Sequence, residues 1–238
     1  MDPLIVSIRE ELVQAVDEKT QQTYQRFFKE KVNAYGCTSA ASIKIAKKYW
    51  KEVCKRDKSD IFLLCEALYQ SGYLEEAYIA SKWVPNLKDR FEPADIGTFK
   101  RWINSYITNW AACDGFCNHS VGVFIEKYPQ CLGELKTWTL SENRWMRRAA
   151  AVSLIIPAKR GKYIRDVLEI ADALLTDEDD MVRKGYGWLL KEASRMHEDI
   201  IFEYVQANKR KMPRTALRYA IELMPKERRA EAMKKDWK

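Results

Sequence analysis

The 238-residue sequence has few of the residues that interrupt helices. Only nine glycines and seven prolines divide long stretches rich in Ala, Leu, Glu, Lys and Arg. Strand-rich domains need frequent turns, and glycine and proline are the strongest turn formers. Their scarcity argues against a sandwich or barrel of strands and predicts an all-α chain.

Long apolar runs are also missing. No stretch approaches the roughly 20 apolar residues that a membrane-spanning helix needs. The opening residues, MDPLIVSIREELVQ, lack the basic and apolar regions of a signal peptide. We therefore expect an intracellular, cytoplasmic protein with no membrane partner, in which the six scattered cysteines stay reduced.

Motifs for cofactors are absent, and metal-ligand patterns are weak. The chain has no phosphate-binding loop, GxGxxG pattern or nucleophile elbow. Cys113, Cys117 and His119 have a spacing found in metal sites, but no second pair of ligands accompanies them. We interpret the two cysteines as buried thiols and expect neither a metal nor a cofactor.

Hydrophobic and basic residues are abundant. The hydrophobic fraction of 47% is enough to bury a full core, and the formal net charge of +7 favours an anionic partner. We expect one domain over residues 1–238, with N-terminal helices over about 2–35 and repeated helix pairs over about 40–238. A monomer is the expected state.

Apolar spacing places the helices of the first half. Leu4, Ile8 and Leu12 lie on one stripe, and Asp2 and Pro3 suit the N-cap and first helical position. The same pattern predicts helices over about 2–17, 18–34, 40–55, 59–71, 73–84 and 95–109.

The second half contains an internal repeat. Three segments align, namely WMRRAAAVSL from Trp145, MVRKGYGWLL from Met181 and MPRTALRYAI from Met212. Each has an arginine two positions after its start, and the intervals of 36 and 31 residues fit a helix, a turn and a second antiparallel helix. Stacked pairs predict a curved α-solenoid. A protein-interaction scaffold is an alternative reading, with the repeated arginine as a structural partner of an acid.

Basic residues cluster in this half. Residues 143–165 carry seven basic side chains and no acid, which is too one-sided for a salt-bridged surface. If equivalent positions stack, they form a basic concave stripe that suits the phosphates of a duplex. The predicted DNA contacts are Arg144, Arg147, Arg148, Lys159, Arg160, Lys162, Lys209, Arg210, Lys211 and Arg214.

Four strings carry a family resemblance over nearly the whole chain. They are NWAACD at 109–114, NRWMRRAA at 143–150, GYGWLLKE at 185–192 and EYVQAN at 203–208. In order and spacing they resemble the AlkD-type DNA alkylation repair glycosylases, which are built from HEAT-like repeats. The resemblance implies an alkylpurine DNA glycosylase that releases cationic bases such as 3-methyladenine or 7-methylguanine from double-stranded DNA for base excision repair.

The resemblance also assigns roles to residues. It implies Asp114 as the catalytic carboxylate, Trp110 and Trp188 as aromatics of the cleft, and Arg148 as a DNA contact. Phe27 stands where a tyrosine is common in the family, so the polar cleft group of that tyrosine is missing. Ala111 stands where an acid often follows the cleft tryptophan.

Elementary chemistry agrees with this small set. Alkylation at N3 or N7 gives the purine a positive charge, so the base leaves without the protonating acid that ordinary glycosidases need. One carboxylate can stabilise the sugar cation and position water, and Trp110, four residues earlier, would share its helix face. Taken singly, Trp110 and Trp188 fit a core and Asp114 before Gly115 fits a turn or cap. A non-catalytic binder of unusual DNA and a scaffold therefore stay open.

Overall fold

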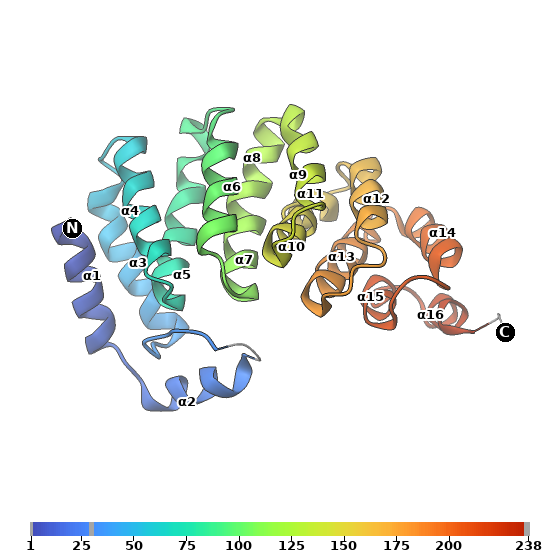
Figure 1. Cartoon of the computed structure of the whole chain (residues 1–238), viewed down its shortest axis with the longest axis horizontal. Helices are drawn as coiled ribbons and strands as arrows, with labels where there is room; N and C mark the ends of the chain where they lie inside the picture. The colour runs from blue at the N-terminus through green and yellow to red at the C-terminus, as the bar shows by residue number, and fades with distance from the viewer. Residues whose placement is uncertain (1, 29–30, 236–238) are drawn as a thin grey trace. The chain divides into compact units, whose positions relative to one another are not determined.

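The regular structure of this chain is helical. The computed structural model describes residues 2–28 and 31–235, and within those ranges strand pairing is limited to two isolated bridges (Figure 1). The all-α prediction is confirmed. None of the helices within those ranges is long and apolar enough to cross a membrane. Two compact units, Met1–Phe116 and Cys117–Lys238, are described separately below.

The first unit follows the predicted helix order closely. Asp2 caps the first helix by accepting a hydrogen bond from Leu4 N at 2.9 Å, and Pro3 occupies the first position, as predicted. Its helices are α1 (Pro3–Gln14), α2 (Glu18–Phe27), α3 (Ser39–Val53), α4 (Lys58–Gln70), α5 (Leu74–Trp83), α6 (Asp95–Tyr106) and α7 (Trp110–Phe116), with a 3-10 segment at Val84–Arg90.

The second helix is shorter than its predicted range of 18–34. It ends at Phe27, Phe28 is extended, and residues 29 and 30 lie outside the described residues. From residue 31 the chain is extended, and its Cys37 forms an antiparallel bridge with Val16. Gly36 has φ +95°, where a side chain would be strained and would meet Gln21 at 2.6 Å. The helix prediction was therefore wrong beyond Phe27, and the amides of Tyr35, Gly36 and Cys37 further on donate to the distant Glu75 side chain.

The second unit opens with a π-helical turn at Cys117–Val121, a geometry that often occurs at functional sites. Its helices are α8 (Gly122–Lys127), α9 (Leu132–Trp138), α10 (Arg144–Val152), α11 (Ile155–Lys159), α12 (Ile164–Ala173), α13 (Asp180–Ala193), α14 (Glu198–Asn208), α15 (Arg214–Ala220) and α16 (Lys226–Met233), with a 3-10 segment at Pro129–Cys131.

The three segments of the internal repeat are equivalent helices. They form α10, α13 and α15, and α13 packs against both of the others. Glycines of α13 permit the close approach on both sides. A Cβ at Gly185 would lie 3.3 Å from Arg148 Cγ, and one at Gly187 would lie 2.9 Å from the Ala216 carbonyl. The GYG string therefore has a packing role that the repeat alone did not reveal.

Candidate active site and nucleic-acid interface

Helix α7, which carries Trp110 and Asp114, is anchored at both ends. At its start the buried Asn109 side chain accepts a hydrogen bond from Ala112 N at 2.9 Å, as an N-cap does. At its end Phe116 is fully buried, with ring centroids 5.4 Å from Phe99 and 5.6 Å from Tyr69. This short helix is therefore held firmly against the core of the first unit.

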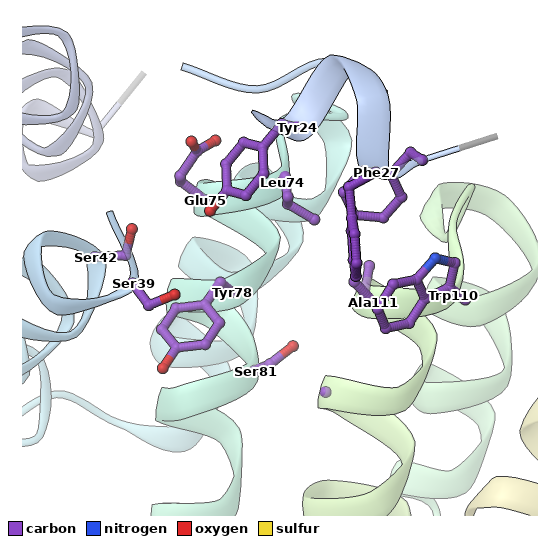
Figure 2. A pocket seen from close by; sticks show the side chains of 13 residues that line it. Tyr24, Phe27, Ser39, Ser42, Leu74, Glu75, Tyr78, Ser81, Trp110 and Ala111 are labelled. Carbon is purple, nitrogen blue, oxygen red and sulfur yellow. The ribbon is translucent and has the colours of Figure 1, made fainter. Parts of the chain in front are cut away.

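A pocket of about 200 Å³ opens beside α7. Figure 2 shows Trp110 and Ala111 of α7 facing Phe27 of α2, with Tyr78 on the neighbouring α5. The Trp110 ring lies 5.6 Å from Phe27 and 5.5 Å from Phe28, measured between centroids. Phe27 is 61% exposed, so it forms a rim and not a buried wall. The structure thus brings together two predicted site residues, Trp110 and Phe27.

A buried carboxylate forms part of the pocket wall. Glu75, on α5, is 2% exposed and accepts hydrogen bonds from the amides of Tyr35, Gly36 and Cys37 at 2.8 to 3.0 Å. Three backbone amides of one segment thus converge on a single side chain of α5. Burial, with a further contribution from Glu75, raises the pKa of Cys37 to about 11. The same two causes, in the same order, raise the pKa of Tyr24 across the pocket.

Asp114 lies next to this pocket along the helix. It follows Trp110 by four residues, so the two positions differ by about 40° around the axis. Asp114 is half-buried, and the α7 residues that line the pocket are Trp110, Ala111, Ala112 and Gly115. Asp114 itself is therefore not among the residues that line the pocket, although residues on both sides of it along α7 are.

The other predicted cleft residues belong to the second unit. Trp188 is half-buried on α13. Arg148, on α10, is 5% exposed, packs against Gly185, and donates a hydrogen bond from Nη1 to the Met181 carbonyl. Arg148 thus crosses from α10 to the first turn of α13. Its predicted DNA contact stays a prediction, alongside this packing role.

The repeated arginines bind the turns before their own helices. Arg147 donates to the carbonyl of Ser141, six residues earlier, and Arg183 donates to the carbonyl of Asp177 at the same offset. Arg147 also pairs with the Asp177 carboxylate at 2.6 Å, and Arg144 pairs with Asp179 at 3.1 Å. The acidic partner that we considered for the repeated arginine is therefore present at Arg147, whereas Arg183 binds a backbone carbonyl.

Residues 143–165 form several ion pairs, so the prediction that they are too one-sided to be salt-bridged was wrong. Their acidic partners come from segments 30 to 36 residues away, and Glu126 pairs with both Arg160 and Lys162. Lys209 is buried, and Arg214 donates to the Met233 carbonyl at 3.2 Å. Three predicted DNA contacts are exposed and make no ion pair with any residue that the structure describes, namely Lys159, Arg210 and Lys211.

The two cysteines that flank Asp114 are buried, as the sequence suggested. Cys113 and Cys117 are fully buried, whereas His119 is exposed. Within residues 2–28 and 31–235 no three His, Cys, Asp or Glu side chains gather in a way that could hold a metal ion. Trp145, the first residue of the first repeat segment, is buried.

The comparison with protein families decides the assignment. A model described as "DNA alkylation repair enzyme" matches residues 8–224. The chain belongs to this family. The resemblance drawn from the four strings is therefore confirmed. No individual curated protein matched.

Solved structures of family members share the fold. A predicted DNA alkylation repair enzyme from Enterococcus faecalis has a TM-score of 0.79 and 19% identity, covering 89% of this chain and 97% of its own. AlkD2 from Streptococcus mutans has a TM-score of 0.59 and 23% identity, covering 75% and 87%. The third structure is the Pseudomonas fluorescens alkylpurine DNA glycosylase AlkC bound to DNA containing an abasic site analog. It has a TM-score of 0.56 and 16% sequence identity, and the match covers 97% of this chain and 66% of the AlkC chain. The chain therefore has an AlkD-like fold.

Most residues of the pocket were not predicted from the sequence, including three aromatic residues and a carboxylate. Tyr24, Phe28 and Tyr78 supply aromatic walls, and Glu75 supplies the carboxylate. The spacing of Tyr24, Phe27 and Phe28 places them on one helical face, which is a usable signal. Glu75 had no such signal, because an acid in the first turn of a helix is ordinarily a solvated residue.

Proposed function

We propose that this chain is a monofunctional DNA glycosylase that hydrolyses the N-glycosidic bond of cationic N3- or N7-alkylated purines in duplex DNA. One observation carries the proposal. In a member of the DNA alkylation repair enzyme family, Trp110 and Phe27 are in ring contact at the wall of an aromatic pocket, and Asp114 follows Trp110 by about one helical turn. Released 3-methyladenine or 7-methylguanine would leave an abasic site for base excision repair.

Asp114 is the proposed catalytic carboxylate. The leaving base already carries a positive charge, so the barrier lies in the sugar cation that develops as the bond breaks. A carboxylate beside the deoxyribose stabilises that charge and positions the attacking water. Indole and phenyl faces attract cations by about 0.5 to 2 kcal/mol each, which favours a charged lesion over an ordinary nucleotide. The reaction needs no metal or cofactor.

The proposal extends to the architecture and to the partner. It includes a solenoid of HEAT-like helix pairs with a basic concave face that binds the duplex as a monomer. Lys159, Arg210 and Lys211 are its best-supported phosphate contacts, because they are exposed and make no ion pair within the described part of the chain. Trp188 and Arg148 are kept as proposed cleft residues of the second unit.

Base release tests the proposal directly. The protein is incubated with duplex DNA containing N7-methylguanine or N3-methyladenine, and free base is measured by chromatography. We expect release by the unaltered chain and a decrease of about 100-fold or more in Asp114→Asn, with DNA affinity retained. Asp60→Asn, which removes an exposed carboxylate from α4 of the same unit, is the matched control and should release base at the unaltered rate.

The alternatives give different results. No release of either base by the intact protein would overturn the glycosylase proposal. Tight binding to branched DNA without base release would then identify a binder of DNA structures. A protein-interaction scaffold would show no affinity for DNA with a steep dependence on salt, whereas several phosphate contacts require such a dependence.

A further inference from the structure

A second pocket, of about 400 Å³, lies beside the aromatic pocket in the first unit. Ala46, Lys47 and Trp50 of α3 form one side of it, and Tyr78, Lys82 and Trp83 of α5 form the other. We call it the α3–α5 groove. None of its residues belongs to the proposed catalytic set.

The floor of the α3–α5 groove is rigid and aromatic. Trp83 is 1% exposed, and its indole Nε1 donates a hydrogen bond to the Ala46 carbonyl at 2.9 Å. Trp50 is only half-buried and leans on Trp83, with centroids 6.3 Å apart and planes inclined by 37°. Because Trp50 packs against a buried ring and is itself partly accessible to solvent, its indole can stack with a nucleic-acid base.

The rim of the groove is positively charged. Lys47 and Lys82 are exposed, and neither pairs with a carboxylate of the described residues, whereas the adjacent Lys48 pairs with Glu11 at 2.6 Å. Lys82 Nζ lies 5.0 Å from the centroid of the Tyr78 ring. Two lysines without acidic partners flanking an aromatic surface complement a phosphate and a flat ring together.

The groove and the aromatic pocket share a wall. Tyr78 lines both of them, and α3 contributes Ser42 to the aromatic pocket and Trp50 to the groove. Eight residues of helix separate Ser42 from Trp50, which is about 12 Å. A stacked DNA strand advances about 3.4 Å per nucleotide, so this distance covers roughly three or four nucleotides.

We propose that the α3–α5 groove binds a nucleotide of the DNA strand that enters the aromatic pocket. The base stacks on Trp50, and Lys47 and Lys82 hold the flanking phosphate. The choice of DNA as the ligand rests on the proposed function. Continuity with the aromatic pocket through Tyr78, combined with the flat Trp50 surface, favours a nucleotide over an acidic peptide.

Equilibrium binding tests the groove without requiring catalysis. A fluorescein-labelled duplex with an abasic site analogue is titrated with each variant, and anisotropy is recorded over a range of salt concentrations. We expect Trp50→Ala to weaken binding about tenfold and Trp50→Phe to retain most of the affinity. Replacing both Lys47 and Lys82 with alanine should reduce the magnitude of the slope of log association constant against log salt concentration by about one to two.

Matched controls exclude general damage. Lys44→Ala removes an exposed cation from the same helix, at a position that lines neither pocket, and should leave the slope unchanged. Circular dichroism and thermal unfolding of every variant verify the fold. In a second measurement, 5-iododeoxyuridine is placed at successive positions beside the abasic analogue, and irradiated complexes are examined by mass spectrometry. We expect a crosslink to Trp50 from one of these positions.

The outcomes are separable from those of the base-release assay. Unaltered DNA binding in Trp50→Ala and in the double lysine variant, with no crosslink at Trp50, would overturn the groove proposal even if base release persists. Trp50-dependent binding of poly-glutamate with unchanged DNA affinity would overturn it in favour of an acidic protein partner. Loss of DNA affinity in these variants of a chain that releases no base would support the groove and refute only the glycosylase.

Discussion

The charged side chains beside the pocket of the first unit have a different role from those beside the repeat helices of the second unit. In the first unit, Glu75 is a buried carboxylate held by three backbone amides beside an aromatic pocket. In the second unit, the conspicuous arginines Arg144 and Arg147 pair with Asp179 and Asp177 next to the following repeat helix. A basic sequence is therefore a poor guide to a basic surface, and the pocket lies in the unit with the less conspicuous charge pattern.

The largest expected effect concerns Glu75. Replacing it with alanine leaves three amides without acceptors in a buried place, so we expect the free energy of unfolding to decrease by about 3 kcal/mol or more. Urea unfolding measures this. Glu192→Ala in the second unit is the matched control, because that buried carboxylate pairs with Arg195, an exposed side chain that water can solvate once the acid is removed. Equal decreases in the two variants would remove the distinction between the units.

Asp177 should have the next largest effect. Its carboxylate pairs with Arg147 and accepts from Asp179 N at 2.9 Å, so Asp177→Ala should cost about 2 kcal/mol of stability. Because the released Arg147 is cationic, DNA affinity should stay constant or rise. Glu178→Ala removes an adjacent exposed acid and should change stability by less than about 0.5 kcal/mol. A decrease of DNA affinity in Asp177→Ala alone would contradict this account.

Paired and unpaired cations of the second unit should differ in their salt dependence. Replacing Arg210 and Lys211 with alanine should reduce the salt slope of DNA binding by about one for each phosphate that the variant no longer neutralises. Arg147→Ala should leave the slope unchanged and lower the stability, because its guanidinium already binds Asp177 and the Ser141 carbonyl. The reverse pattern would place Arg147 on the DNA and the other two away from it.

The smallest expected effect is a difference in pH dependence. The hydrogen bond from Arg101 lowers the pKa of Glu66 in the first unit below its ordinary value of 4.5. Its contribution is present above pH 4.5 and is lost as the pH falls through the folded-state pKa. In the second unit, hydrogen bonds to Asp166 and Glu169 raise the pKa of Lys136 above 10.5, so its contribution is lost at alkaline pH. The unfolding midpoints of Glu66→Gln and Lys136→Met are measured across pH. Glu66→Gln should remove the acid-dependent loss of stability, and Lys136→Met should remove the loss at alkaline pH.

Helices and repeats could be predicted from the sequence because their signals are local. The stripe of Leu4, Ile8 and Leu12 and the cap at Asp2 located α1, and the spacing of three arginine-bearing segments located α10, α13 and α15. The string NWAACD located the segment that carries Trp110 and Asp114, which the structure shows to be helical. All of these depend on neighbours within a few residues or on a repeated pattern.

The features that could not be predicted from the sequence depend on partners that are distant along the chain. Arg147 and Asp177 are 30 residues apart, and Glu75 meets the amide of Tyr35 across 40 residues. One sequence contains no information about such pairs beyond the residue types. The segment that follows α2 also has a distant partner, because the amides of Gly36 and Cys37 donate to Glu75, 39 and 38 residues further along the chain. A buried acid of this kind needs coordinates to be found.

The bridge between Val16 and Cys37 has a consequence for engineering. Asp17 N also donates to the Gly36 carbonyl at 3.0 Å. The segment that follows α1 is therefore hydrogen-bonded to the segment that precedes α3. The excursion between them carries Tyr24 and Phe27 to the rim of the aromatic pocket. Under the proposed function, exchanging residues 17–36 for those of a relative should alter which alkylated bases are released.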